Sequence, residues 1–218
     1  MTTPASVSPV DSDATPRAVT DAPPCPAGFR AAGTACGIKP GGTLDLGLIL
    51  AEPAATAAAM FTRNRVRAAP IDLSADHLAA TGGRCRGLLV SSGNANALTG
   101  TRGVADARRM ALAVAAATGA MPGEVLVNST GIIGVPLPAD RIEDAVPGLV
   151  AAAGVEGLGD FAEAIRTTDS HRKIAVARIG DAPDAPDAPI VVGVAKGSGM
   201  IHPDMATMIG VVLTDAAV

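Results

Sequence analysis

The stretch Ala195-Lys-Gly-Ser-Gly-Met-Ile-His-Pro-Asp-Met-Ala-Thr-Met-Ile-Gly-Val-Val-Leu-Thr-Asp215 organises the rest of the chain. An apolar, β-branched run at residues 190–194 precedes it, and a second such run occupies residues 208–213, so we expect two strands. The Gly-Ser-Gly and Pro between these runs favour a turn, since glycine adopts positive φ without strain. The sequence therefore predicts strand, turn and strand, with Thr207 opening the second strand.

Thr207 is suited to nucleophilic catalysis if the peptide bond before it is cut. Cleavage of Ala206–Thr207 would give Thr207 a free α-amino group, and such an amine can act as the base that activates the neighbouring hydroxyl. The ordinary pKa of an α-amino group is about 8, which leaves a useful neutral fraction at pH 7. The hydroxyl could make the cut itself by attacking the carbonyl of Ala206. The alternative is that Thr207 is an ordinary strand residue and the glycines form a plain turn.

The string at residues 196–208 resembles the autoprocessing segment of the bifunctional glutamate N-acetyltransferase/ornithine acetyltransferase family of arginine biosynthesis. The resemblance covers about residues 28–215. Further matching stretches are Gly28-Phe29, Gly37-Ile-Lys39, the Phe-Thr…Ala-Ala-Pro run at 61–70, Ser-Gly-Asn-Ala-Asn-Ala at 92–97, Ser-Thr-Gly at 129–131 and Thr-Thr-Asp at 167–169.

This resemblance implies an α/β fold with layered sheets and helices, of the kind shared with a class of N-terminal-nucleophile aminopeptidases, and here apparently truncated. It divides the chain into a flexible tail at 1–24, an α-chain acetyltransferase domain at 25–206 and the start of a β chain at 207–218. The tail is also indicated by its composition, which is rich in Pro, Ser, Thr, Asp and Ala.

The resemblance also implies a two-step acyl transfer. Thr207 attacks the acetyl carbonyl of N2-acetylornithine, Thr130 and Gly131 hold the oxyanion, ornithine leaves, and glutamate takes the acetyl group. A strand that ends in Thr-Gly offers a hydroxyl and backbone N–H groups as such donors. Lys196 and the pair Thr167 and Thr168 would contact substrate. No cofactor is implied, although acetyl-CoA is a possible acetyl donor, and the expected partner is a β chain in an α/β heterotetramer.

The family precursor continues well past the nucleophile, whereas this chain has eleven residues after Thr207. Three hypotheses therefore stay open: an acetyltransferase half, an N-terminal-nucleophile amidohydrolase half, and a catalytically inactive fragment. The coding sequence downstream would discriminate between them.

Composition excludes several other classes of protein. Of the 218 residues 48% are hydrophobic, which excludes a mainly disordered chain, and the net charge of −4 gives no basic surface for nucleic acid. No apolar run reaches membrane-spanning length, and the N-terminus lacks the pattern of a signal peptide. The cysteines Cys25, Cys36 and Cys85 show no CxxC spacing, so we expect neither disulfides nor a metal site, and a cytoplasmic protein.

The remaining patterns predict a succession of strands and helices. We expect a strand at 44–51 that ends at Pro53, with a partner at 57–62 that continues into Arg63, Arg65 and Arg67 on one face. Ser74 is expected to cap a helix at 74–80, and Pro147 to interrupt a helix that begins at Pro138. Further strands are expected at 86–90, 124–128 and 173–178, and further helices at 104–119 and 159–165. Residues 181–189, three Asp-Ala-Pro repeats, are expected to form a loop.

Overall fold

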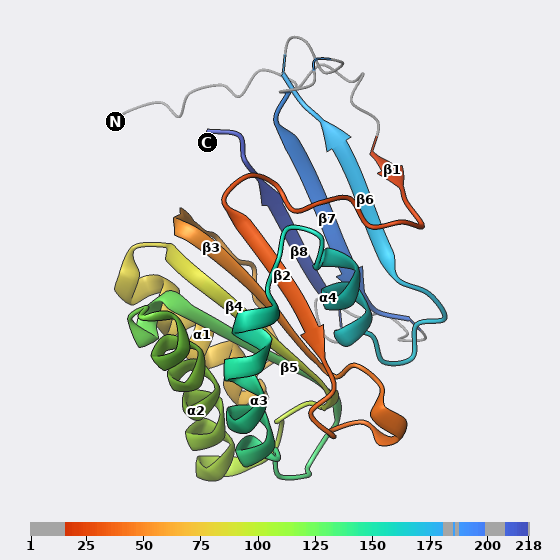
Figure 1. Ribbon diagram of the computed structural model, residues 1–218. Coiled ribbons are helices and arrows are strands. Elements are labelled where there is room, and N and C mark those ends of the chain that lie inside the picture. The colour runs from red at the N-terminus through yellow and green to blue at the C-terminus, as the bar shows by residue number, and fades with distance from the viewer. Residues whose placement is uncertain (1–15, 181–184, 186–187, 199–207, 218) are drawn as a thin grey trace.

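The computed structural model describes residues 16–180, 185, 188–198 and 208–217 (Figure 1). This part of the chain forms two four-stranded sheets, one with strand order β2-β3-β4-β5 and one with order β1-β6-β7-β8. The strands are β1 (Arg17–Ala18), β2 (Phe29–Thr34), β3 (Leu46–Thr56), β4 (Arg84–Asn94), β5 (Val125–Ile132), β6 (Lys173–Arg178), β7 (Ile190–Lys196) and β8 (Ile209–Thr214). The α-helices are α1 (Ala69–Thr81), α2 (Gly100–Thr118), α3 (Ala139–Ala152) and α4 (Leu158–Ala164). The predicted α/β fold with layered sheets and helices is confirmed.

Side-chain alternation along β3 creates the layers. Leu46, Leu48 and Leu50 point to one face, where they pack in a core with residues of α1, α2 and α3 such as Met110. Ile49 points to the other face and joins a second core. The sheet that contains β3 is therefore buried on both sides.

Helix α4 lies on that second face, and the other sheet contributes Val192, Val194 and Leu213 to the same core (Figure 1). Helix α4 packs closely against the sheet because the facing residues of β2 and β3 include glycines, which have no side chain. A Cβ at Gly33 would lie 2.3 Å from the carbonyl oxygen of Asp160, and one at Gly47 would lie 2.9 Å from the ring of Phe161. This close packing fixes the end of α4, and hence the start of the segment that carries Thr167.

The strands that matter for function end at the same side of the molecule. β4 and β5 are parallel, so their C-terminal ends meet, with Gly93 opposite Gly131. β7 is antiparallel to β6 and β8, which brings Lys196 opposite Ile209. The sequence predicted β7, β8 and β6 closely, and the helix at 104–119, which ends at Gly119 in the left-handed conformation, is confirmed.

Several predicted boundaries are wrong. β3 does not end at Pro53 but runs to Thr56, because the pairing with β4 shifts between Leu50 and Ala55 and such an irregularity tolerates a proline. Residues 57–62 do not form a strand, since β3 is already paired with β2 and β4.

The helices also differ from the prediction. α1 begins at Ala69, and Ser74 is buried inside it, where its hydroxyl donates to the carbonyl of Val127 at 2.7 Å. α3 continues through Pro147, which is exposed. Burial of Ile142 and Leu149 on either side outweighs the cost of a proline in a helix, about 3 kcal/mol.

Two further regions depart from expectation. Arg63, Arg65 and Arg67 lie in an exposed loop rather than on a strand, and Arg67 forms an ion pair with Asp72 at 2.6 Å. The expected tail contains β1, which pairs with β6 through Arg17 and Val176.

Candidate active site

A buried lysine joins two of the predicted site residues. Lys196, at the end of β7, is 2% exposed, and its Nζ donates to the Oγ1 of Thr130 at 3.0 Å and to the Oγ1 of Thr167 at 2.7 Å. Thr130 lies near the end of β5 and is also buried, while Thr167 follows α4. Three segments far apart in the sequence thus converge on one ammonium group.

The environment of Lys196 is unusual for a charged side chain. Burial lowers its pKa; the neighbouring carboxylate of Asp169 opposes this shift, and the positive charge of Lys173 adds to it. A charged lysine has three N–H donors, and the described contacts use two of them. Among the described residues the third donor of Lys196 has no acceptor, so it is suited to an oxygen atom of a ligand.

The hydrogen-bond directions leave Thr130 able to donate. Its Oγ1 accepts from Lys196, so its own O–H proton is available to another acceptor. Beside it, Gly131 has φ 138° and packs against the backbone of β4: a Cβ there would lie 2.3 Å from the carbonyl carbon of Gly93. Thr130 and Gly131 lie inside β5 rather than in a turn after it, and only glycine fits at the second position.

The two adjacent threonines Thr167 and Thr168 have different places. Thr167 belongs to the lysine cluster, whereas Thr168 is exposed and its hydroxyl donates to the carbonyl of Ser198 at 3.2 Å. The Thr167 segment is also held from the other side, where the Nζ of Lys39 donates to the carbonyl of Arg166 at 3.0 Å. Burial lowers the pKa of Lys39, and the carboxylate of Asp45, the largest opposing influence, raises it.

Asp169 and Lys173 are polar residues that the sequence analysis did not assign to the site. The Oδ1 of Asp169 accepts from the Nζ of Lys173 at 2.5 Å and from the backbone N–H of Gly197 at 2.8 Å. Burial alone would raise the pKa of Asp169, but these two hydrogen bonds and the positive charges of Lys173 and Lys196 together outweigh it, and the pKa is lowered. The sequence signal for this ion pair was the i, i+4 spacing of two opposite charges. Such spacing predicts contact only on a helix, whereas Lys173 begins strand β6.

The predicted nucleophile Thr207 and the cleavage residue Ala206 lie outside the described residues. The described chain before this segment ends two residues after Lys196, and it resumes at Met208 beside β8. The roles of Thr207 and Ala206 therefore stay predictions.

Asn94 and Asn96, which belong to the matching stretch at 92–97, have a structural role. The amide of Asn94 donates to the carbonyls of Val135 and Pro136, and its Oδ1 accepts from the backbone N–H of Asn96. Both side chains are buried. They fix the loop that follows β4.

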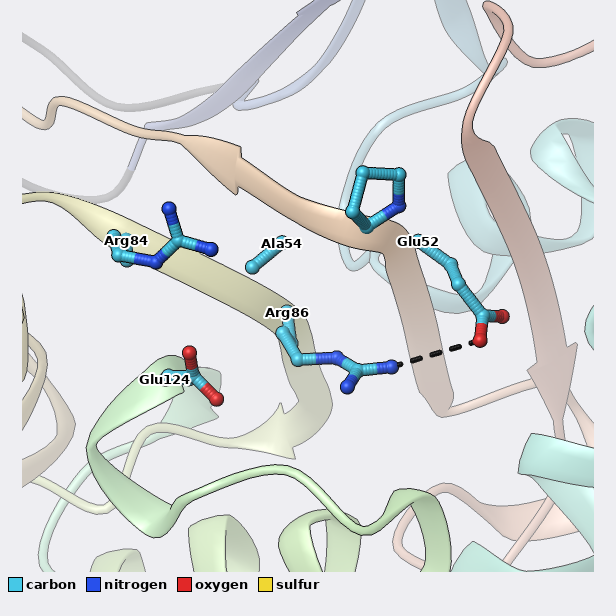
Figure 2. A pocket seen from close by; sticks show the side chains of 6 residues that line it. Glu52, Ala54, Arg84, Arg86 and Glu124 are labelled. Carbon is cyan, nitrogen blue, oxygen red and sulfur yellow. Dashed lines mark ion pairs between the residues drawn. The ribbon is translucent and has the colours of Figure 1, made fainter.

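A surface pocket of about 560 Å³ lies at the opposite ends of β4 and β5 (Figure 2). It is lined by Glu52, Pro53, Ala54, Arg84, Arg86 and Glu124. Two basic and two acidic side chains border it, and Arg86 pairs with Glu52 at 3.7 Å. Because its charges balance and it lies away from Lys196, we do not place the site there.

Other features of the described residues bear on metal and thiol chemistry. They hold no group of three or more His, Cys, Asp or Glu side chains arranged for a metal ion. Cys25, Cys36 and Cys85 are free, and burial raises the pKa of Cys25 to about 11 and that of Cys36 to about 12. No described helix is both long and apolar enough for a membrane span.

Comparison with known proteins gives the chain its family. The model of the ArgJ family matches residues 30–218. An arginine biosynthesis bifunctional protein ArgJ from Geobacter sulfurreducens is 49% identical over 191 residues, which cover 88% of this chain and 47% of the relative. The corresponding protein of Thermus thermophilus is 46% identical, with 88% of this chain and 48% of the relative covered. The chain thus spans about half the length of the curated relatives it matches.

Two solved structures share the fold. The crystal structure of an arginine biosynthesis bifunctional protein ArgJ from Bacillus halodurans superposes with a TM-score of 0.78 at 37% identity, covering 89% of this chain and 100% of that chain. An ornithine acetyltransferase from Mycobacterium tuberculosis, complexed with ornithine, gives a TM-score of 0.76 at 42% identity, covering 87% and 98%. The fold type that the sequence resemblance implied is confirmed, and the chain belongs to the ArgJ family.

Proposed function

We propose that this chain is one half of an acetyltransferase that moves the acetyl group of N2-acetylornithine to glutamate. The observation that supports this most is the contact of Lys196 with Thr130 and Thr167, at the end of the strand that leads toward Thr207. Family membership and the relative described as an ornithine acetyltransferase complexed with ornithine support the choice of substrate.

The proposed reaction passes through an acetyl ester of Thr207. The Thr207 hydroxyl oxygen attacks the acetyl carbonyl, and its proton passes to the Thr207 α-amine. The C–N bond of acetylornithine then breaks, the proton moves to the departing ornithine nitrogen, and the acetyl group stays on Thr207. The amine of glutamate attacks this ester and the C–O bond breaks. A proton from the glutamate nitrogen passes through the Thr207 α-amine to the Thr207 oxygen, which restores the hydroxyl.

Thr130 and Gly131 are the proposed donors to the oxyanion of both tetrahedral intermediates. The Thr130 hydroxyl accepts from Lys196, which polarises it and directs its proton outward. Lys196 itself is the proposed partner for an oxygen atom of the substrate, by its third N–H donor. Thr167, which bonds with Lys196, and the exposed Thr168 are the further proposed substrate contacts.

Self-cleavage at Ala206–Thr207 is proposed to generate the nucleophile. The Thr207 hydroxyl attacks the Ala206 carbonyl and the C–N bond breaks, giving an ester and a free amine. Water then hydrolyses the ester, which leaves a carboxylate on Ala206 and restores the hydroxyl. We propose that cleavage needs the second half of the protein that the longer relatives contain, because attack by the Thr207 hydroxyl on the Ala206 carbonyl requires a precisely positioned turn.

The proposed partners are acetylornithine, glutamate and the β chain, assembled as an α/β heterotetramer. The chemistry above uses only protein groups and substrates, so we propose no cofactor, with acetyl-CoA as a possible second acetyl donor. A cytoplasmic location is proposed, and the free, high-pKa thiols fit a reducing compartment.

The test needs the chain joined to the second half found in its relatives. The protein is incubated with acetylornithine, with and without glutamate, and acetylglutamate and acetate are measured. We expect acetylglutamate only with glutamate and little acetate in either case, since an acyl-enzyme that awaits an amine must exclude water. Equal acetate release in both would favour the amidohydrolase, and no product in either would favour an inactive fragment.

A further inference from the structure

We propose that Asp169 and Lys173 are positioning residues that hold Gly197, the residue at which the chain leaves β7 toward Thr207. This inference rests on the proposed function and adds residues to which that function assigns no role. The pair is called the Gly197 clamp below.

The Gly197 clamp forms hydrogen bonds with both the backbone N–H and the backbone carbonyl of Gly197. The N–H of Gly197 donates to the Oδ1 of Asp169 at 2.8 Å, and its carbonyl accepts from the Nζ of Lys173 at 2.6 Å. The same Nζ donates to the same Oδ1 at 2.5 Å, which closes the ring of contacts. Since both peptide groups of Gly197 are fixed, the direction of the chain after Lys196 is fixed as well.

The clamp lies next to the lysine cluster and connects with it through the chain. Asp169 follows Thr167 by two residues, and Gly197 follows Lys196 directly, so the two segments bonded through Lys196 and Thr167 are bonded again through the clamp. The carboxylate of Asp169 also opposes the lowering of the Lys196 pKa.

The burial of Asp169 is difficult to explain by stability alone. Its side chain is 1% exposed, and its Oδ2 has no hydrogen-bond partner among the described residues. A buried oxygen whose hydrogen bond is not made lowers the stability of the folded state. The other such atom, the Oδ2 of Asp106, at least has Arg102 at 3.7 Å.

The strand pairing does not need the clamp. β6 and β7 are joined by an antiparallel ladder from Lys173 opposite Ala195 to Arg178 opposite Ile190. Gly197 lies beyond that ladder, so its only described backbone anchors are Asp169 and Lys173. Loss of the clamp should therefore loosen the segment before Thr207 more than it destabilises the sheet.

The experiment uses the protein joined to its second half and compares Asp169→Asn, Lys173→Met and the double variant with wild type. Lys173→Arg tests rescue, because arginine keeps the charge and can donate to both oxygens. Asp72→Asn is the matched control, since it removes an aspartate ion pair with Arg67 that does not touch Gly197. The self-cleavage rate is measured by intact mass, and kcat and KM by product formation.

We expect the cleavage rate and kcat to fall about 10–10²-fold in Asp169→Asn and Lys173→Met, which is typical of a misplaced reacting group. KM for acetylornithine should change by less than about threefold. The double variant should be little worse than either single variant, because the two residues act as one unit. Lys173→Arg should recover most of the rate, and Asp72→Asn should match wild type.

Wild-type kcat and cleavage in both single variants would overturn the inference, and so would a fall in thermal stability with unchanged kcat, which is the result for a merely structural ion pair. These outcomes require an active wild type. If wild type neither cleaves nor transfers, the proposed function fails first, and hydrogen exchange at the Gly197 amide still tests the clamp. Exchange there should be about tenfold faster in Lys173→Met, and an unchanged rate would contradict the clamp.

Discussion

The two ends of the parallel pair β4–β5 differ in how their charged side chains are exposed and paired. At the N-terminal ends, Arg86 and Glu52 are partly exposed, 29% and 64% by side chain, and pair loosely at 3.7 Å (Figure 2). At the C-terminal ends, Lys196 is buried, and its described hydrogen-bond partners are the hydroxyls of Thr130 and Thr167.

The two ends differ in the hydration free energy that their charged groups lose on folding. An exposed ion pair is solvated and screened, so it needs no special arrangement. A buried cation whose hydrogen bonds go to neutral oxygens loses hydration without a direct carboxylate partner. Such an arrangement is expected where chemistry uses the charge. Among the described residues, Lys196 is the one buried basic side chain.

The largest expected effect is at Thr207, the proposed nucleophile. In a protein that carries this chain and the second half found in its relatives, Thr207→Ala should abolish self-cleavage and acetyl transfer together, because the proposed mechanism forms its covalent ester on the Thr207 hydroxyl. Intact mass and acetylglutamate assays measure the two losses. Normal transfer in this variant would refute the assignment of the whole site.

A smaller loss is expected at Thr130, which donates to the oxyanion but forms no bond with substrate. Removal of one such donor typically costs about 10²–10³ in rate. Thr130→Ala should therefore transfer slowly but measurably, and mature protein should still accumulate, since cleavage needs a single turnover. A wild-type transfer rate would return residues 128–134 to a structural role.

The buried lysine should also be visible in the pH dependence of stability. Because the pKa of Lys196 is below its ordinary 10.5 in the folded state, the unfolded chain binds more protons between the two values. Wild type should therefore gain stability from this group as the pH rises toward 10.5, and lose it as the pH falls through the folded pKa.

Lys196→Met removes that gain. Denaturant unfolding of both proteins at several pH values should show their stability difference shift in favour of wild type as the pH rises. A difference that does not change with pH would mean that Lys196 is not held in a buried environment.

The smallest effects belong to the other end of the sheet. Arg86→Ala removes an exposed pair, so the free energy of unfolding should change by about 0–1 kcal/mol and the transfer rate should stay at the wild-type value. Urea unfolding and the acetylglutamate assay are the measurements. A tenfold loss of transfer here would remove the distinction between the two ends.

The sequence predicted the elements with strong local patterns, such as β7, with its β-branched run, and α2, with its helical spacing and Gly119. It did not predict that Pro53 lies within β3 or that Pro147 lies within α3, because tertiary packing overrode the local preference of proline. The boundary of α1 was wrong for a related reason. Ser74 resembled a cap, but its hydroxyl bonds with β5, a partner that lies 53 positions further along the chain.

The site residues also divide into those that a sequence motif identified and those that depend on tertiary structure. The motif resemblance identified Thr130, Gly131, Lys196 and Thr167, and the structure brings Thr130, Lys196 and Thr167 into direct contact. The clamp of Asp169 and Lys173 on Gly197 could not be predicted, because it depends on how β6 and β7 pair. Thr168 also needed the structure, since nothing in the sequence separates it from its neighbour.

In the proposed function, Thr207 carries the acetyl group between the two substrates. The most direct measurement is intact mass of the cleaved, two-half protein after brief incubation with acetylornithine in the absence of glutamate. We predict a mass increase of one acetyl group, confined to the peptide that begins with Thr207 and lost when glutamate is added. A protein that releases ornithine while its Thr207 peptide stays unmodified would contradict the account.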